Sequence, residues 1–179
     1  DDVKFLLTSD LHLTDHPKDA YRWSIFPWLT MHAINRQVDA IFLLGDITDK
    51  KDHHSNEFIN DVVDALKKLA KDSCCPVIII KGNHDYLNPN RPLLRLFDSC
   101  SSAKEALLES GEWRNEPYFF TYKQSIKIKG VRFLLVPHTR DWRAAKIRAH
   151  GQKFMFIHQT IKGSISSNGT KLDGLRKDY

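Results

Sequence analysis

Three short apolar runs, each ending in polar residues, are the feature that most constrains the fold of this chain. The runs cover residues 3–8, 40–44 and 76–80. The polar residues that follow them are Ser9-Asp10-Leu11-His12, Gly45-Asp46 and Lys81-Gly82-Asn83-His84-Asp85. Continuous apolar runs of this length, bounded by turn residues, are typical of β-strands that are buried on both faces. We therefore expect three central strands, each followed by a polar loop.

The segments between these runs have the periodicity of helices. Between the second and third runs, apolar residues recur at helical spacing, and Ser55 is placed to cap the helix at its N-terminus. Between the first and second runs, Pro27 can lie in the first turn of a helix that runs to about Val38. A strand–helix–strand–helix–strand order predicts parallel strands joined by right-handed crossovers.

The second half of the chain changes to short strands with close turns. Four strands are expected at residues 118–122, 125–129, 131–137 and 153–157, with a hairpin turn at Lys129-Gly130. The chain thus predicts an α/β fold in which helices cover a mixed sheet or two packed sheets. At 179 residues its length fits one domain, and we expect residues 1–179 to form it.

The composition is that of a globular protein with a modest positive charge. The formal net charge of +5 weakly favours an anionic partner, although Lys67, Lys68 and Lys71 are more typical of a solvated helix face than of a nucleic-acid patch. The three cysteines include the adjacent pair Cys74-Cys75 and no Cys-x-x-Cys spacing, so we expect reduced thiols and a cytoplasmic location. No apolar run reaches transmembrane length, and no membrane partner is expected.

The three polar clusters follow strands expected to be parallel, and the carboxyl ends of such strands are where α/β sheets bind ligands. Asp10 and His12 are two residues apart and can face the same side of an extended chain. Asp46 follows a glycine, which permits a sharp turn. Either cluster alone is better explained as a simple turn, but the third adds an amide, an imidazole and a carboxylate. Together they predict oxygen and nitrogen ligands for divalent metal ions.

These clusters resemble the first three signature blocks of the calcineurin-like metallophosphoesterase superfamily, and His158, after the strand expected at 153–157, resembles the next block. The resemblance therefore spans most of the chain. It implies two packed mixed β-sheets flanked by helices, with a metal site at the carboxyl ends of the strands. It also implies two divalent metal ions, with Mn²⁺ expected first and Mg²⁺, Fe, Zn²⁺ or Ni²⁺ as alternatives.

The resemblance assigns a role to each motif residue. The assigned metal ligands are Asp10 and His12 for the first ion, Asp46 as the bridge, and Asn83 and His158 for the second ion. His84 would contact the phosphate and protonate the leaving oxygen, and Asp85 would orient its ring. This division agrees with general chemistry, because two neighbouring cations need a shared anionic bridge and a nearby imidazole can act as general acid.

The other histidines leave alternatives open. His158 follows an apolar run and could by itself be a buried core residue. His138 also follows an apolar run and competes for a place in the site. His53 and His54 lie in a polar stretch, where a solvated loop is the simpler interpretation.

One block of the resembling family is missing. In that family a Gly-His-x-His segment supplies one further ligand to each metal, and no such motif follows His158 in this sequence. We therefore expect that the domain lacks this C-terminal segment and that the natural chain continues to it. We also expect residues 1–179 by themselves to bind metals weakly, because a loosely held site has imprecise geometry.

The form of the motifs favours one branch of the superfamily. Serine/threonine protein phosphatases carry Arg-Gly soon after Gly-Asp and Glu after Gly-Asn-His, whereas this chain has Lys50-Lys51 and Asp85 at those places. The chain is most similar to the DNA-repair exonuclease-like branch, which includes phage-encoded members. This implies a phosphodiesterase or nuclease whose partner is nucleic acid. The basic residues expected to hold backbone phosphates are Lys50, Lys51, Arg91 and Arg95.

Two other functional classes stay open. A small-molecule phosphodiesterase or phosphatase, including a cyclic-nucleotide enzyme, would need a closed pocket in place of an open basic groove. A non-catalytic interaction module would keep the motif blocks without the chemistry. The presence of His84 and Asp85 argues against the module, because loss of the catalytic acid would be its simplest sign.

Overall fold

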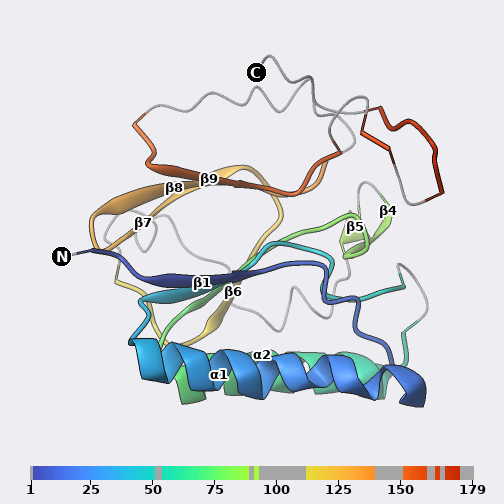
Figure 1. The fold of residues 1–179 in the computed structure, drawn as a ribbon, viewed down its shortest axis with the longest axis horizontal. Coiled ribbons are helices and arrows are strands. Elements are labelled where there is room, and N and C mark those ends of the chain that lie inside the picture. Colours follow the sequence, from blue (N-terminus) through green and yellow to red (C-terminus); the bar gives the residue numbers. More distant parts are fainter. Residues whose placement is uncertain are drawn as a thin grey trace.

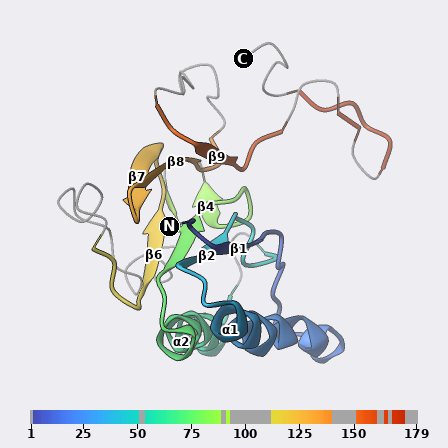
Figure 2. The ribbon, with the colours of Figure 1, turned by 60° about the vertical axis from the view of Figure 1, so that its left-hand side comes forward.

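The computed structural model describes residues 2–50, 54–88, 91–92, 112–139, 151–160, 164–165 and 168–173, with the backbone alone for 86–88 and 91–92. These residues form three layers, which are a pair of helices, a four-stranded sheet and a three-stranded sheet (Figure 1). Figure 2 shows that the four-stranded sheet lies between the other two layers. The predicted α/β fold with two sheets and helices is confirmed.

The central sheet is built from the three apolar runs and one strand of the second half. Its order is β1 (Phe5–Thr8), β2 (Ala40–Leu43), β3 (Val77–Ile80) and β6 (Pro117–Phe120). All three pairings are parallel. The parallel pairing predicted for the three apolar runs is confirmed. The resemblance implied a mixed sheet, but among the described strands this one is purely parallel, which agrees with β2 and β3 being buried at every position.

Two α-helices cover one face of this sheet (Figure 1). The α2 helix (Asn56–Ser73) begins as predicted, with Ser55 Oγ accepting a 3.0 Å hydrogen bond from the Phe58 N–H. The α1 helix (Ile25–Arg36) begins two residues before Pro27, because the 3₁₀ helix η1 (Pro17–Ser24) leads directly into it. No helix in the described part of the chain is long and apolar enough to cross a membrane.

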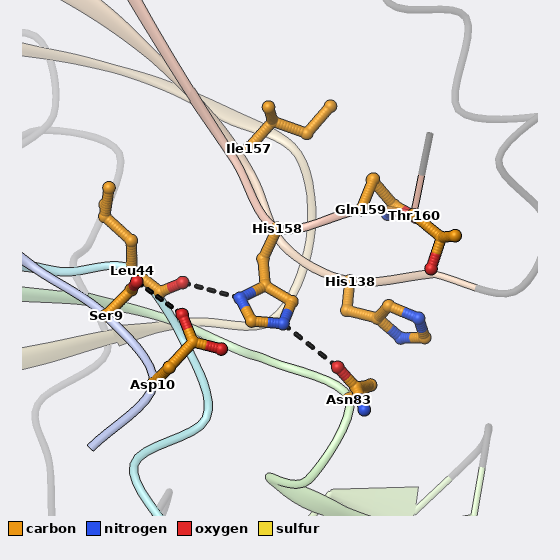
Figure 3. Close-up of a pocket in the computed structure, with 9 residues that line it drawn as sticks. All are labelled: Ser9, Asp10, Leu44, Asn83, His138, Ile157, His158, Gln159 and Thr160. Carbon is orange, nitrogen blue, oxygen red and sulfur yellow. Dashed lines mark hydrogen bonds between the residues drawn. The ribbon is translucent and has the colours of Figure 1, made fainter. Parts of the chain in front are cut away.

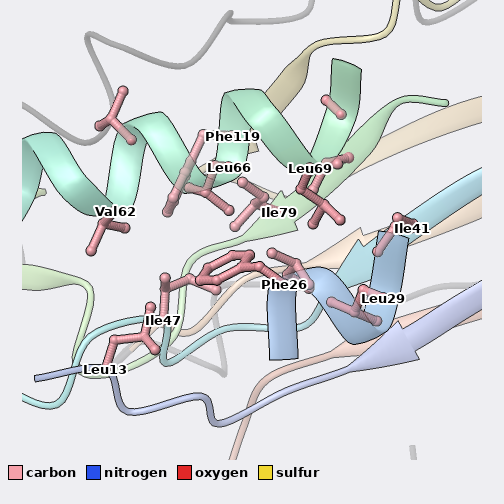
Figure 4. Close-up of a cluster of buried hydrophobic side chains, with 14 of the residues drawn as sticks. Leu13, Phe26, Leu29, Ile41, Ile47, Val62, Leu66, Leu69, Ile79 and Phe119 are labelled. Atoms are coloured by element: carbon pink, nitrogen blue, oxygen red, sulfur yellow. The ribbon is translucent and has the colours of Figure 1, made fainter. Parts of the chain in front are cut away.

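The helices and the central sheet enclose the larger apolar core, seen in Figure 4. Phe26 and Leu29 of α1 and Leu66 of α2 point toward the strands, where Ile41 and Ile79 are fully buried. Apolar residues at helical spacing on α2 thus form the predicted buried face.

The opposite face of the central sheet packs against the second sheet. This sheet has the order β7 (Gln124–Ile128), β8 (Val131–Val136) and β9 (Phe154–Ile157). It is mixed as predicted, because β7 and β8 are antiparallel and β8 and β9 are parallel. Lys129 and Gly130 form the expected hairpin turn, with φ angles of 44° and 81°. Phe5 joins the two sheets through edge-on ring contacts with Phe42 and Phe133, each at 5.6 Å between centroids.

A small two-stranded sheet follows the third polar cluster. It consists of β4 (Tyr86–Asn88) and β5 (Arg91–Pro92) in antiparallel pairing. Its first strand, β4, begins directly after the cluster that ends at Asp85. The polar loops after β1, β2 and β3 therefore lie at one edge of the molecule, where their side chains can meet.

Candidate metal centre

The loops that follow β1 and β2 are joined through their backbones. The parallel register places Thr8 opposite Leu43, so the two strands end level with each other. Beyond the strands, the Asp10 N–H donates to the Gly45 carbonyl and the His12 N–H to the Asp46 carbonyl, both at 3.0 Å. The pairing of the strands thus continues into the loops and brings the first two predicted clusters together.

Three of the predicted metal ligands have left-handed backbone conformations. The φ angles are 56° at Asp10, 45° at His12 and 53° at Asp46. Such conformations cost a non-glycine residue about 1–2 kcal/mol and concentrate at functional sites. Here they turn all three side chains toward the sheet edge and away from the strand axis.

Two glycines let the loops approach each other. Gly45 has a φ of 96°, and a Cβ built there would lie 2.5 Å from His158 Nδ1 and 2.8 Å from Gly82 Cα. A Cβ on Gly82 would overlap both Oδ1 and the backbone nitrogen of Asp46. Any larger residue at either position would push apart the groups that form the site.

The carboxylate of Asp46 is the centre of the arrangement. It is 3% exposed, and its two oxygens face different histidines. Oδ1 lies 3.5 Å from His158 Nε2, and Oδ2 lies 3.8 Å from His12 Nε2. Burial opposes its ionisation, but hydrogen bonds from the His158 ring and the His84 N–H outweigh burial and hold the pKa of Asp46 below its ordinary value. A carboxylate that faces two donor groups in this way can bridge two cations.

His158 follows β9 and faces Asp46 with Nε2, while its Nδ1 is held by a backbone carbonyl. Figure 3 shows Nδ1 directed at the Leu44 carbonyl, 2.7 Å away, and Nε2 directed at Asn83 Oδ1, 3.0 Å away. Because a carbonyl only accepts, Nδ1 must donate to Leu44, which leaves Nε2 facing the oxygens of Asn83 and Asp46. Two oxygens aimed at one imidazole nitrogen require either a proton or a cation between them.

In the absence of a metal, the surrounding oxygens favour the protonated form of His158. Burial lowers the pKa of His158, but the hydrogen bonds to Asp46 and to the Leu44 carbonyl, with the negative charges of Asp46 and Asp10, raise it to about 9. Asp10, Asp46 and His158 form one group of possible metal ligands. Each offers one ligand atom, and these three atoms lie within 4.8 Å of one another. The predicted ligands of the second ion thus converge, and Asp10 lies beside them.

His12 is at the centre of the second group of ligand atoms. Its Nε2 lies 3.8 Å from both Asp10 Oδ1 and Asp46 Oδ2, so the predicted ligands of the first ion also converge. Its Nδ1 is buried and makes no hydrogen bond of good geometry, although Asp49 Oδ1 lies 3.3 Å away. The ring of His84 meets that of His12 edge-on, with 4.9 Å between the ring centroids. His12, Asp46 and His84 thus form the second group of possible metal ligands.

Asp49, for which no role was predicted, contacts both His12 and His84. Its carboxylate approaches His12 Nδ1, and its carbonyl oxygen is hydrogen-bonded by His84 Nδ1. Its position is fixed by a 3.1 Å hydrogen bond from its own N–H to the Leu13 carbonyl. The only sequence signal was its place three residues after Asp46, on a loop whose course the sequence does not reveal.

The role expected for Asp85 is wrong. Its carboxylate accepts hydrogen bonds from the backbone N–H groups of Gly82 and Asp46, both at 2.8 Å, and of Ile47 at 3.0 Å. The side chain is fully buried and makes none of its hydrogen bonds to the His84 ring, which is oriented by the Asp49 carbonyl. Burial raises the pKa of Asp85 to about 6 against the opposing effect of these hydrogen bonds. Asp85 therefore holds the loops in place.

Two hollows flank Asp10. One, of about 320 Å³, contains Asn83, His138 and His158 (Figure 3). His138 thus lies near the predicted second-ion ligands, its ring 6.3 Å from that of His158. The other hollow, of about 480 Å³, is lined by Asp10, Leu11, His12, Tyr21, Arg22 and Asp49. Tyr21 and Arg22 lie in η1, which contains no motif residue, so they were not predicted from the sequence.

The predicted phosphate-binding residues are only partly described. Lys50 is exposed and follows Asp49 directly, and its carbonyl lies 2.6 Å from His54 Nε2. The side chain of Arg91 and the whole of Lys51 and Arg95 lie outside the described residues. His53, the neighbour of His54, also lies outside them.

The converging donors suit divalent cations. They combine carboxylate oxygens, an amide oxygen and imidazole nitrogens, the ligand types that borderline and hard divalent metals share. His12 Nε2, which lies 3.8 Å from carboxylate oxygens of Asp10 and Asp46, and the oxygen-facing His158 Nε2 are polar atoms whose surroundings a bound cation would complete.

Two relatives and one solved structure are similar to part of this chain. A protein of Coxiella burnetii named "Probable cyclic nucleotide phosphodiesterase" is 34% identical over 89 residues, which are 48% of this chain and 33% of that protein. Protein 244L of Invertebrate iridescent virus 6 is 26% identical over 113 residues, 63% of this chain and 36% of that one. The chain spans about a third of the length of these two relatives. Among solved structures, a dimetal phosphatase from Danio rerio aligns with a TM-score of 0.48 and 16% identity, covering 80% of this chain and 49% of that chain.

A family model supplies the assignment. The model of the calcineurin-like phosphoesterases matches residues 3–166, which include all the motif residues that converge at the sheet edge. The chain therefore belongs to the calcineurin-like phosphoesterase family, whose members use a dinuclear site for divalent metals.

Proposed function

We propose that the chain is the catalytic domain of a metal-dependent phosphodiesterase that hydrolyses nucleic acid, in the DNA-repair exonuclease-like branch of the family. The observation that carries the proposal is the position of Asp46, whose buried carboxylate presents one oxygen to His12 and the other to His158. An anion placed between two sets of ligands is what a dinuclear hydrolase needs, because it binds both cations and partly neutralises their repulsion.

The metals would be held by the residues that converge around Asp46. These are Asp10, His12, Asp46, Asn83 and His158. We propose that both divalent cations are Mn²⁺. When bound, they would supply a nucleophilic water at neutral pH and would offset charge on the phosphoryl oxygens. The protein fixes the direction of its ligands through the Leu44 carbonyl, which orients His158, and through Asp85, which holds the loops.

His84 is proposed to protonate the leaving oxygen. His84 Nδ1–H donates a hydrogen bond to the Asp49 carbonyl, which leaves the opposite ring nitrogen, Nε2, for proton transfer. The backbone N–H of His84 donates a 2.9 Å hydrogen bond to Asp46 Oδ1, which keeps the imidazole next to the proposed bridge. General acid catalysis of this kind typically supplies about 10²- to 10⁴-fold in rate.

The two hollows on either side of Asp10 favour a phosphodiester over a monoester. A diester carries an esterified group on each side of its phosphorus, and each group can enter one hollow while the phosphate lies between them. The positive net charge of the chain and the exposed Lys50 add attraction for a polyanion. The second candidate is a small-molecule phosphodiesterase, which is favoured by the printed name of the Coxiella relative and by the limited size of each hollow.

Hydrolysis assays with matched substrates test the proposal. The chain is incubated with Mn²⁺, or with excess EDTA, and given bis-p-nitrophenyl phosphate, p-nitrophenyl phosphate, cyclic AMP, single-stranded DNA or duplex DNA. We expect Mn²⁺-dependent cleavage of the diesters and of DNA, and little cleavage of the monoester. Cleavage of cyclic AMP without DNA cleavage selects the second candidate, and preference for the monoester contradicts both.

The salt dependence of binding separates the two candidates further. Affinity for a single-stranded oligonucleotide should fall with rising salt, with a log–log slope of about −2 for three phosphate contacts. The His84→Ala variant serves for these measurements, because we expect it to bind without cleaving. A flat dependence argues against a nucleic-acid substrate.

A further inference from the structure

The larger hollow beside Asp10 has an outer wall that contains no motif residue. Asp10, His12 and Asp49 form its inner side, and Tyr21 and Arg22 of η1 form its outer side. At about 480 Å³ it falls within the range of small-ligand pockets. A group esterified to a phosphate at Asp46 would therefore reach these two side chains next.

Arg22 is fixed to the proposed ligand loop. Its Nη1 donates a 2.5 Å hydrogen bond to the His12 carbonyl, and its Nη2 lies 3.7 Å from Asp19 Oδ1. Asp19 is held in turn by the hydroxyl of Thr14, at 3.0 Å. The outer wall is thus tied to the loop that carries His12, so the distance from η1 to the site is set by direct contacts.

The ring of Tyr21 is oriented by Arg22 but remains open to solvent. Arg22 Nε donates to the Tyr21 hydroxyl at 3.4 Å, and the guanidinium lies 5.9 Å from the ring centroid. Tyr21 is nevertheless 68% exposed, so its ring is open to a ligand from solvent. An aromatic ring that is positioned yet uncovered loses little conformational entropy when a planar group stacks on it.

We infer that Tyr21 is a stacking platform for a nucleobase of the substrate, in a subsite formed with Arg22 beside the metal centre. The inference rests on the proposed function and deepens it, because it specifies that the esterified group bears a base. Stacking tolerates any base, so the subsite would select nucleotides as a class without reading their sequence. Arg22 acts as a positioning residue that holds the ring and the His12 loop together.

Binding of two matched oligonucleotides tests the inference without relying on catalysis. Fluorescein-labelled decathymidylate and a ten-residue abasic strand with the same phosphates are titrated with the chain in EDTA, and anisotropy is recorded. We expect the wild type to bind the base-bearing strand more tightly. Tyr21→Ala should weaken binding of that strand by about 5- to 150-fold while leaving the abasic strand unchanged.

Two control variants distinguish stacking from a structural effect. Tyr21→Phe keeps the ring and loses only the hydroxyl, so it should retain the preference for bases. Tyr122→Ala removes a tyrosine that is 82% exposed and lines neither hollow, and it should change nothing. Equal weakening of both strands by Tyr21→Ala, or no weakening of either, overturns the inference. This experiment measures binding and not hydrolysis, so the two proposals can fail separately. Absence of hydrolysis would contradict the proposed function, whereas the effect of Tyr21→Ala on binding would decide the stacking inference.

Discussion

The carboxylate of Asp85 accepts a hydrogen bond from the backbone N–H of Asp46, with 2.8 Å between oxygen and nitrogen. The same oxygen accepts from Gly82, also at 2.8 Å, and the other oxygen accepts from Ile47 at 3.0 Å. One buried side chain thus connects the loop after β2 with the loop after β3. The position of the central carboxylate of the metal centre depends on this connection.

Replacing Asp85 should therefore affect stability as well as activity. Asp85→Ala removes the acceptor of four buried N–H groups, and each such loss costs about 1–3 kcal/mol. We expect the free energy of unfolding to fall by about 3 kcal/mol or more, measured by urea unfolding in EDTA. Asp85→Asn keeps one acceptor oxygen and should lose less. A variant that loses activity at unchanged stability would restore the original expectation that Asp85 serves the His84 ring.

The close approach of Gly82 to Asp46 gives a second test. Gly82→Ala places a methyl group against a backbone nitrogen that cannot move independently, and such overpacking costs about 1–3 kcal/mol. We expect this variant to lose Mn²⁺ affinity by calorimetric titration, because the methyl displaces Asp46. Gly130→Ala is the matched control, since its φ of 81° gives strain but nothing lies within 4 Å of the added Cβ. It should lower stability by about 1 kcal/mol and leave metal affinity intact.

The elements that the sequence predicted are those that local pattern decides. The apolar runs became β1, β2 and β3 because nothing in them competes with a buried strand. The α2 helix begins after its capping residue, Ser55. The α1 helix has Pro27 in its first turn, as expected, but η1, which leads into it, was not predicted because a 3₁₀ helix carries no strong sequence pattern.

The parts of the centre that the sequence could not reveal depend on loop conformation. Asp85 contacts backbone N–H groups of the loop after β2, and Asp49 contacts the rings of His12 and His84. These contacts exist only once the left-handed turns are formed. The motifs indicated which side chains gather at the site. However, the position of Asp85 directly after His84 does not show whether its carboxylate binds the His84 ring or backbone N–H groups. Tyr21 was missed for the same reason, because only the folded chain places η1 beside Asp10.

Substitution at Asp46 and His84 separates metal binding from proton transfer. Asp46→Asn removes the negative charge that faces both groups of ligands, so Mn²⁺ affinity should fall by more than about 10-fold. His84→Ala should reduce hydrolysis of bis-p-nitrophenyl phosphate by about 10²- to 10⁴-fold and keep most of the metal affinity. Asp64→Asn, an exposed carboxylate on α2, is the control for the change in charge. If His84→Ala loses metal as severely as Asp46→Asn, His84 is a ligand.

The stability of the metal-free protein should depend on pH through His158. Its folded-state pKa of about 9 is above the unfolded value of 6.5, so its contribution is fully present below pH 6.5 and is lost as the pH rises through 9. The difference in free energy of unfolding between wild type and His158→Gln, in EDTA, should therefore shrink by about 3 kcal/mol between pH 6 and pH 9.5. Taking the difference removes the titration of groups that do not contact His158.

A cation should replace this proton. Because Nε2 faces the oxygens of Asn83 and Asp46, a metal bound there occupies the position of the proton and releases it. Calorimetric titration with Mn²⁺ at pH 7.5, in two buffers of different ionisation enthalpy, should show about one proton released by the wild type and fewer by His158→Gln. The pH dependence of stability seen in EDTA should then weaken when Mn²⁺ is present. Metal binding without proton release at this pH would show that the cation is bound elsewhere and that His158 keeps its hydrogen bond to Asp46.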